Sequence, residues 1–247
     1  MMMTTTTSTS RRSSSNRIDA TTLAFASANG RSLHIKCSTR SDGDFHRTGV
    51  PFDVLARRRR SFVDLPWTQL DQVHGTAAVR IDAPGAADGQ RGDIAVTSLD
   101  DAVLGCWVGD CAPVVLIGSG SEFAIVHAGW RGLARRVIET ALAAFTETVV
   151  GAVLGPTIGP CCYEFGSADL ELVAAGVGCD PSQITASTSE GRPALDVGAA
   201  VEAAVGALTL HRIGACTGCG YPGFSHRVRR DPQRHVVAVW RPSGARS

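Results

Sequence analysis

The sequence predicts an α+β fold, a single domain of mixed sheets with packed helices. Short strand-like segments follow one another through the first half of the chain, and helical patterns are concentrated after residue 130. Beyond residue 30, no repeat or linker-like stretch divides the 247 residues into two domains. We therefore expect one catalytic domain over residues 31–247. A disordered Thr/Ser-rich low-complexity tail is expected over residues 1–30.

The strands are predicted from alternating or continuous apolar residues that end at turn-rich loops. In chain order, the expected strands cover residues 33–38, 67–75, 78–81, 93–98, 102–108, 114–117, 123–126, 149–154 and 236–240. Between the last two lie a short apolar segment at 213–216 and a Gly/Pro-rich loop that runs to Gly223.

Helical periodicity predicts three helices in the second half. The longest begins near Gly132 and places one apolar face on Leu133, Val137, Ala141, Leu142 and Phe145. The others are expected near 168–175 and 197–208, the last with Asp196 as its N-cap. Four consecutive arginines at 57–60 are best explained as a solvated helix face or loop, with a patch for phosphate or an acidic partner as the alternative.

Composition excludes several functional classes. The formal net charge is +1, which argues against a nucleic-acid or anionic-membrane partner, and no apolar run reaches the roughly 20 residues of a membrane span. Lys36, the single lysine, precedes Cys37, so a Walker A loop is excluded. Arg11 and Arg12 are followed by serines rather than the apolar core of a twin-arginine signal. We expect a cytoplasmic protein, and nothing in the chain suggests assembly beyond a monomer.

Three residues at strand ends indicate a metal site. His74 and His127 each end a strand-like segment before a glycine-containing turn, and Cys111 lies between two strands. A His/Cys/His set suits zinc with one open position, as in catalytic zinc sites. The wide spacing of the three residues argues against a zinc finger. The alternative is three unrelated core residues.

The segment around His127 is the most informative stretch. A buried strand at 123–126 delivers His127, and Gly129 and Gly132 allow a close backbone approach to a ligand. Free N–H groups at the following helix start, beside Arg131, favour an anion such as phosphate. The alternative is a strand–helix corner with a hydrogen-bonded core histidine.

The remaining cysteines give a weaker signal. Eight cysteines are too few for a disulfide scaffold. Cys216 and Cys219 form a lone CxxC, which lacks the second pair of a four-cysteine zinc ribbon. Cys161 and Cys162 could add ligands, but neighbouring side chains point in opposite directions in an extended chain.

Several ordered motifs resemble one known family. They are Gln72-Val-His-Gly, Gly109-Asp-Cys-Ala-Pro, His127-Ala-Gly-Trp-Arg-Gly, Gly155-Pro-Thr-Ile-Gly-Pro-Cys-Cys-Tyr-Glu and a closing Cys216-Thr, Phe224-Ser-His-Arg and Trp240. The chain is identified by them as a member of the laccase-domain (YfiH-like) family, known as polyphenol oxidases and purine nucleoside phosphorylases. The residues at 38–45 resemble that family's first loop. The sequence departs from the family at 45–60 and at Val228, which interrupts a double arginine.

The resemblance implies a YfiH-like, cysteine-hydrolase-like architecture with zinc bound by His74, Cys111 and His127. It implies phosphorolysis of adenosine, inosine, guanosine or methylthioadenosine, with adenosine deaminase as a side activity. Cys111, His127 and Arg131 are the expected catalytic residues, with Arg131 the first candidate for holding phosphate. The expected substrate-binding residues are Arg40, Gln72, Arg131, Tyr163, Glu164, Phe224 and Arg227.

Three other functions compete with this expectation. A copper-dependent polyphenol oxidase uses a similar ligand set, but all three methionines lie at residues 1–3 and no His-x-His pair occurs. A cytoplasmic amidase that edits peptidoglycan precursors would use Cys111 or zinc-activated water on an amide bond. A non-enzymatic binding module would carry no metal.

Overall fold

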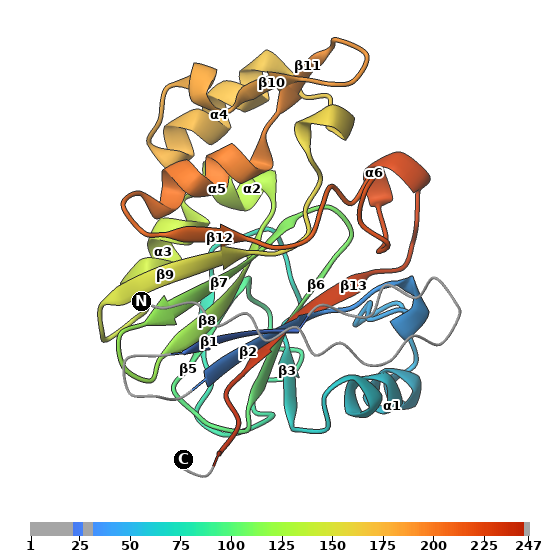
Figure 1. Cartoon of the computed structure of the whole chain (residues 1–247), viewed down its shortest axis with the longest axis vertical. Helices are drawn as coiled ribbons and strands as arrows, with labels where there is room; N and C mark the ends of the chain where they lie inside the picture. The colour runs from blue at the N-terminus through green and yellow to red at the C-terminus, as the bar shows by residue number, and fades with distance from the viewer. Residues whose placement is uncertain (1–21, 27–31, 245–247) are drawn as a thin grey trace.

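In the part of the chain that the computed structural model describes, residues 22–26 and 32–244, the strands form two large mixed sheets and a separate hairpin (Figure 1). The five-stranded sheet has the order β1 (Thr22–Ala26), β2 (Ser32–Cys37), β13 (His235–Trp240), β6 (Val103–Val108) and β3 (Trp67–Gln69). The six-stranded sheet has the order β12 (Leu210–Arg212), β9 (Val149–Leu154), β7 (Ala112–Gly118), β8 (Phe123–Ala128), β5 (Ile94–Thr97) and β4 (Ala78–Arg80). The hairpin pairs β10 (Thr185–Ser187) with β11 (Pro193–Leu195).

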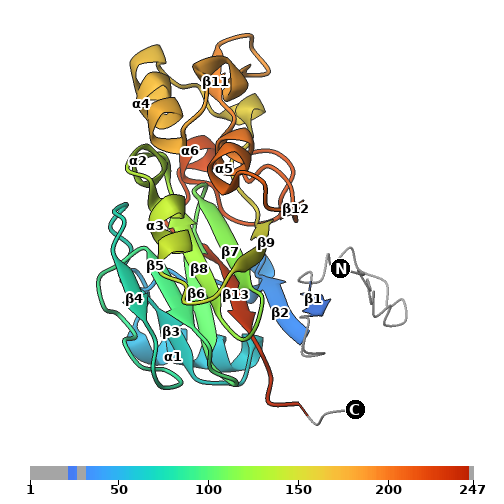
Figure 2. The ribbon, with the colours of Figure 1, turned by 90° about the vertical axis from the view of Figure 1, so that its left-hand side faces the viewer.

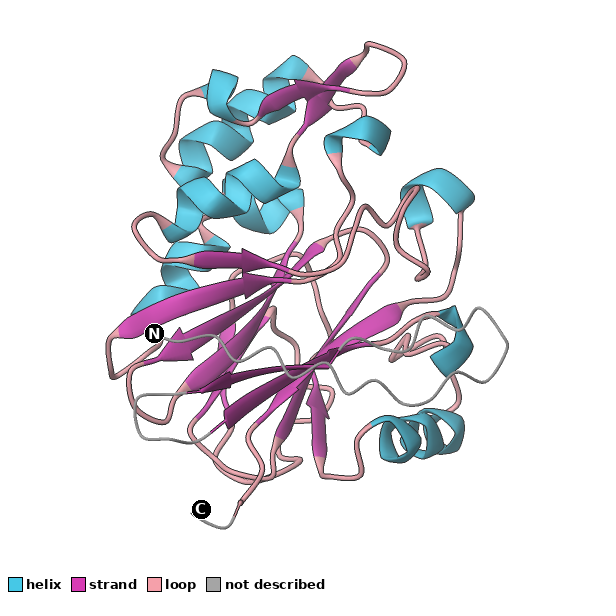
Figure 3. Cartoon of the chain, in the orientation of Figure 1, coloured by secondary structure: helices cyan, strands magenta, loops and turns pink. Residues whose placement is uncertain are grey.

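The helices lie outside the two sheets (Figure 3). They are α1 (Phe52–Phe62), α2 (Trp130–Ala134), α3 (Val137–Ala143), α4 (Ser167–Val177), α5 (Val197–Val205) and α6 (His226–Arg229), with short 3-10 turns η1 (Arg40–Asp42), η2 (Pro160–Cys162) and η3 (Pro181–Gln183). The predicted α+β class with mixed sheets is confirmed. Among the described residues, no helix is long and apolar enough to cross a membrane.

The alternation of side chains along β7 explains the layering. Val115 and Ile117 belong to an apolar cluster shared with β2, β6 and β13 of the other sheet. Val114 and Leu116 face the opposite way and pack in a second cluster with residues of α2 to α5. Both faces of this strand are therefore buried, which accounts for its continuous apolar sequence. Figure 2 shows α3 lying over the six-stranded sheet, with α2, α4 and α5 towards one end of it.

The prediction of one long helix from Gly132 is wrong. The segment forms two helices, α2 and α3, because Arg136 adopts a left-handed backbone conformation with φ of 64°. Both short helices contact β8 and α5, and α2 also packs against α4. Apolar spacing continues across the break, so periodicity alone did not reveal it.

Three further expectations need correction. The predicted tail at 1–30 contains β1, which pairs antiparallel with β2; the rest of that tail lies outside the described residues. The strand expected at 67–75 ends at Gln69, because the following residues bond to a loop at Gln90 and Asp93 rather than to a strand, so His74 lies in a loop rather than at a strand end. The arginine run is part of α1, but Arg59 is buried and pairs with Asp88, so it is not a solvated residue.

Candidate metal centre

Adjacent strands bring two of the predicted ligands together. β7 pairs with β8 so that Pro113 lies opposite His127, and Cys111 immediately precedes β7. His74 comes from the loop after β3. The ligand atoms of His74, Cys111 and His127 all lie within 4.8 Å of one another. The Cys111 Sγ and His74 Nε2 atoms are 3.8 Å apart, and the two imidazole rings meet edge to face.

One buried carboxylate, Asp93, fixes both histidines. It directly precedes β5, the other neighbour of β8, and its Oδ1 lies 2.8 Å from Nδ1 of His127. The same oxygen accepts a hydrogen bond from the backbone N–H of His74 at 2.9 Å, and Oδ2 accepts one from Gly75 at 2.8 Å. Sequence reasoning missed Asp93. The available signal was an aspartate at the start of a predicted buried strand, where an unpaired charge would be costly.

The backbone at the centre is adapted to close packing. His74 has a φ of 58°, in the left-handed region that non-glycine residues rarely adopt, and the bonds to Asp93 hold it there. A Cβ atom on Gly129 would lie 2.9 Å from Cδ2 of His74 and 3.1 Å from Sγ of Cys111. Gly129 therefore makes room for the ligand side chains themselves, which refines its predicted role.

The three titratable groups stabilise one another's charged forms. Burial alone would raise the pKa of the Cys111 thiol, but the charge of His127 brings it down to about 6. Burial would likewise lower the pKa of His127, yet the Cys111 thiolate and Asp93 raise it to about 9. Burial also opposes ionisation of Asp93, but hydrogen bonds from His127 and Gly75 keep its pKa below the usual value.

This arrangement fits a zinc ion. Two imidazoles and an ionised thiol match the ligand types that zinc prefers, and three protein ligands leave one position open. Nδ1 of His127 donates a hydrogen bond to Asp93, which leaves Nε2 as the ligand atom. A carboxylate partner on the other ring nitrogen is a common feature of metal-binding histidines. Metal binding would displace the imidazolium proton, because only the neutral ring can be a ligand.

Three predicted substrate residues lie beside one another. The guanidinium of Arg227 lies 4.7 Å from the centre of the Tyr163 ring and donates to the carbonyl of Glu164. The carboxylate of Glu164 pairs with Arg192 instead. Burial, with a further contribution from the nearby Cys111 thiolate, raises the pKa of Tyr163 to about 12. The contribution of the Cys111 thiolate to the pKa of Tyr163 indicates that this side chain lies near the metal centre.

Asp110, next to Cys111 in the chain, anchors helix α6, which carries Arg227, and the loop that leads to it. Its Oδ1 accepts hydrogen bonds from the hydroxyls of Thr217 and Ser225 at 2.6 and 2.8 Å. Its Oδ2 accepts one from the backbone N–H of Arg227 at 2.6 Å. The loop from β12 to α6 is thereby fixed to the segment that bears a metal ligand, a link that sequence reasoning did not find.

Other predicted substrate residues have partners within the protein. The guanidinium of Arg40 lies over the ring of Phe224 and pairs with Asp231. The amide of Gln72 accepts from the backbone N–H of Trp107 at 3.0 Å and donates to its carbonyl at 2.8 Å. The contacts of Gln72 thus tie the loop that leads to His74 to strand β6.

Arg131 is exposed at the start of α2 and stacks 4.4 Å from the centre of the Trp130 ring. Within the described residues it forms no ion pair with a carboxylate. The helix begins at Trp130 rather than Gly132 and is five residues long, so its dipole is weaker than the sequence suggested. The guanidinium charge of Arg131 is therefore a stronger attraction for an anion than the dipole of α2.

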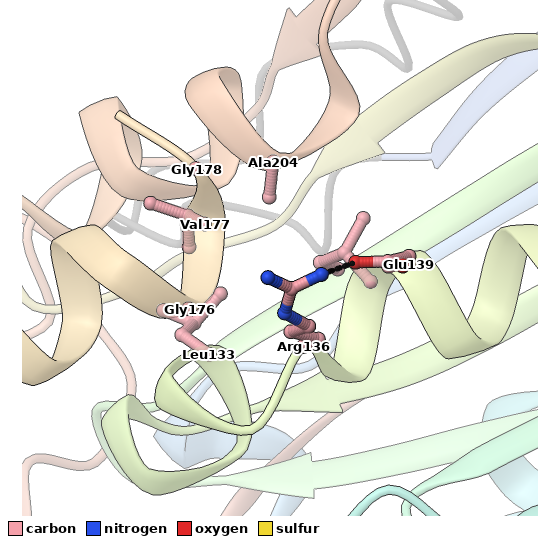
Figure 4. A pocket seen from close by; sticks show the side chains of 8 residues that line it. Leu133, Arg136, Glu139, Gly176, Val177, Gly178 and Ala204 are labelled. Atoms are coloured by element: carbon pink, nitrogen blue, oxygen red, sulfur yellow. Dashed lines mark hydrogen bonds and ion pairs between the residues drawn. The ribbon is translucent and has the colours of Figure 1, made fainter. Parts of the chain in front are cut away.

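A pocket lies between α2, α3, α4 and α5 (Figure 4). Its charged side chains, Arg136 and Glu139, pair with each other at 3.0 Å. None of the predicted ligand or substrate residues lines it. The pocket therefore carries no functional assignment.

Fold and centre together define an α+β protein in which two adjacent strands and a loop bring together a histidine and cysteine set suited to a metal. A family model described as multi-copper polyphenol oxidoreductase laccase matches residues 40–242. The chain belongs to this laccase-domain family.

Named relatives agree with that membership. The chain is 36% identical over 187 residues to a purine nucleoside phosphorylase of Xylella fastidiosa (strain Temecula1), a match that covers 69% of this chain and 70% of the relative. It is 33% identical over 181 residues to one of Streptomyces coelicolor, covering 69% and 73%. The solved structure of Bacillus licheniformis YfiH has a TM-score of 0.74 at 19% identity and covers 91% of this chain and 98% of that one, which shows the fold.

Proposed function

We propose that this protein is a zinc-dependent purine nucleoside phosphorylase, with adenosine deaminase as a side activity. The observation that carries the proposal is the convergence of His74, Cys111 and His127 on one point. It is supported by Arg131 and Arg227, which form no ion pair with a carboxylate in the described part of the chain. The names of the relatives support the reaction class. Adenosine, inosine, guanosine and methylthioadenosine are the proposed substrates. A cytoplasmic location and a monomeric state stay predictions.

The roles of the residues follow from their contacts. His74, Cys111 and His127 would hold the zinc ion, which supplies a Lewis acid with an open position. Asp93 orients His127 and fixes the backbone of His74. These are contributions to positioning, which is effective only when the reacting groups are held rigidly.

Phosphorolysis forms a bond between a phosphate oxygen and C1′ of the ribose and breaks the bond from C1′ to the base. Phosphate must be held against C1′, and we assign this role to the guanidinium groups of Arg131 and Arg227. Neither pairs with a carboxylate among the described residues, whereas Arg40 pairs with Asp231. Tyr163, whose ring packs against the guanidinium of Arg227, offers an aromatic surface for the purine.

The test uses purified protein with each of the four nucleosides plus phosphate. Products are separated by liquid chromatography. We expect free base and the matching sugar 1-phosphate in equal amounts, which is ribose 1-phosphate from three of the nucleosides and 5-methylthioribose 1-phosphate from methylthioadenosine. We also expect inosine from adenosine when phosphate is left out. Cys111→Ala is the control. Product formation no greater than that of the control would refute the proposal.

A thiol amidase is the second candidate function. Cys111, His127 and Asp93 form a chain of interacting groups like that of cysteine hydrolases, and the pKa of the thiol is lowered to about 6. The amide substrate would be a mis-acylated muramyl peptidoglycan precursor. Its hydrolysis by chelator-treated protein, without nucleoside turnover, would favour this candidate.

The description of the family model favours a third candidate, a copper-dependent polyphenol oxidase. That reaction reduces dioxygen, so it stops under anaerobic conditions, whereas phosphorolysis continues. Oxidation of a phenol by the copper-loaded protein in air, with no nucleoside turnover by the zinc-loaded protein, would favour the oxidase.

A further inference from the structure

A second group of possible metal ligands lies outside the centre described above. Cys161 and Cys162 come from η2, and Cys216 and Cys219 from the loop between β12 and α6. The four sulfur atoms all lie within 4.8 Å of one another, and Sγ of Cys161 and Sγ of Cys219 are 3.6 Å apart. All four thiols are free. The lone CxxC of the sequence thus has its second pair.

We propose that these four cysteines bind one structural zinc ion in a closed tetrahedral site. Zinc–sulfur bonds of about 2.3 Å, directed to the corners of a tetrahedron, separate the sulfur atoms by about 3.8 Å. The 3.6 Å between Sγ of Cys161 and Sγ of Cys219 is close to that value, and every pair of the four sulfur atoms lies within 4.8 Å. It is tighter than an iron–sulfur cluster requires, since such a cluster places several atoms between its cysteines.

The local backbone removes the objection that adjacent cysteines point apart. Cys161 and Cys162 lie in a 3-10 turn rather than an extended strand, so both side chains reach the same point. On the other side, the N–H groups of Gly220 and Tyr221 both donate to the carbonyl of Cys216 at 2.8 Å. This tight turn brings Cys219 back beside Cys216.

Hydrogen bonding and packing around the thiols are also those of a metal site. The N–H of Gly159 donates to Sγ of Cys216 at 3.1 Å, a contact that stabilises a thiolate. A Cβ atom on Gly218 would lie 2.9 Å from Sγ of Cys162, so the chain approaches the sulfur as closely as glycine permits.

The charge of the site has a compensating group. Zinc with four thiolates carries a net charge of about −2. Arg229 lies against the same turn, where its guanidinium donates to the carbonyl of Gly218 at 2.9 Å and to that of Thr217 at 3.0 Å. Arg229 also pairs with Asp231, but Arg40 pairs with the same carboxylate, so these three groups together keep a net positive charge. A cation held at this position lowers the cost of concentrating negative charge on the cysteines.

The zinc would join two loops that have little regular structure. One runs from β9 to α4 and carries Tyr163, and the other runs from β12 to α6 and leads to Arg227. Cross-linking long loops restricts the unfolded chain, so the ion stabilises the fold. If the proposed function holds, the same link positions Tyr163 and Arg227 for substrate.

The first test is zinc content by elemental analysis of the purified full chain. We expect two zinc ions per wild-type chain, one in Cys219→Ser, one in His74→Ala and two in Cys179→Ser, the control at a cysteine outside both groups. Cys219 is exposed, so its substitution should not prevent folding. One ion in the wild type and none in His74→Ala would overturn the proposal, as would two ions in Cys219→Ser.

The second test does not need a variant in the cysteine group. X-ray absorption of zinc-loaded His74→Ala should show sulfur neighbours alone, at about 2.3 Å. Nitrogen neighbours would refute the site. So would iron in place of zinc, or disulfides between these cysteines in protein purified without reductant. This test is independent of nucleoside turnover, so failure of the proposed function would leave its result unchanged.

Discussion

Asn in place of Asp93 removes the charge that holds the two histidines of the metal centre. Asp93 accepts hydrogen bonds from Nδ1 of His127 and from the backbone N–H groups of His74 and Gly75. An amide has one oxygen where the carboxylate has two. The orientation of Asn that keeps the bonds to His127 and His74 faces its NH₂ group towards the N–H of Gly75.

At least one buried donor therefore loses its acceptor. Hydrogen bonds to charged groups contribute about 1.5–3 kcal/mol each, so we expect the free energy of unfolding to fall by about 2–3 kcal/mol. Groups that orient metal-binding histidines typically change metal affinity by about 10–100-fold, which is the loss expected here. The structure predicts both losses together because one carboxylate makes all of these bonds.

Zinc affinity is measured by competition with a chelator of known affinity, counting only the ion that Cys111→Ala protein lacks. Stability is measured by urea unfolding. Asp88→Asn is the matched control, because it breaks an ion pair with the buried Arg59 instead. It should lower stability but leave zinc affinity unchanged. Unchanged zinc affinity in Asp93→Asn would show that the carboxylate does not position the ligands.

Three other predictions follow from buried contacts. Burial holds the pKa of His235 at about 3, below the 6.5 of the unfolded chain, so protonation favours unfolding as pH falls below 6.5. Between pH 7.5 and pH 5 this protonation lowers the free energy of unfolding of the wild type by about 2 kcal/mol. In urea unfolding, the drop in His235→Asn between the same two pH values should be smaller by that amount. Equal drops in the wild type and the variant would contradict the assignment. In the same assay, Leu116→Ala should lower the free energy of unfolding by about 2–5 kcal/mol, because Leu116 is buried between the sheet and the helices. Leu172→Ala, at an exposed site, should change it by no more than about 0.5 kcal/mol. Similar losses in the two variants would refute the burial of β7 on both faces. Asp110→Ala should raise KM for phosphate roughly tenfold with little change in kcat, because α6 and its Arg227 lose their anchor. An unchanged KM would exclude a role of Asp110 in positioning Arg227.

Much of the sheet core could be predicted because its signal is local. Strands β5, β6, β8 and β9 coincide closely with apolar runs bounded by turn residues. The same signal located His127 and Cys111, since a strand end holds a side chain at a fixed place. The pairing of β7 with β8 then explains why residues that are separate in sequence meet.

The features that could not be predicted depend on the tertiary structure. Asp93 appears in the sequence only as a polar residue before a strand, and its donors come from two separate segments, the loop at His74 and Gly75 and strand β8 at His127. The break at Arg136 lies at a left-handed backbone conformation that neither helix propensity nor apolar spacing indicates. The meeting of Cys161 with Cys219 depends on how two loops fold, which spacing within either loop does not determine.

The central claim is that the His74, Cys111 and His127 centre performs metal-dependent phosphorolysis. Its most direct test is the initial rate of ribose 1-phosphate formation from inosine and phosphate as zinc is returned to chelator-treated protein. We predict a rate that rises in proportion to zinc bound at this centre and that is absent at every zinc level in Cys111→Ala. A rate independent of zinc, or equal rates in the wild type and the variant, would contradict the claim.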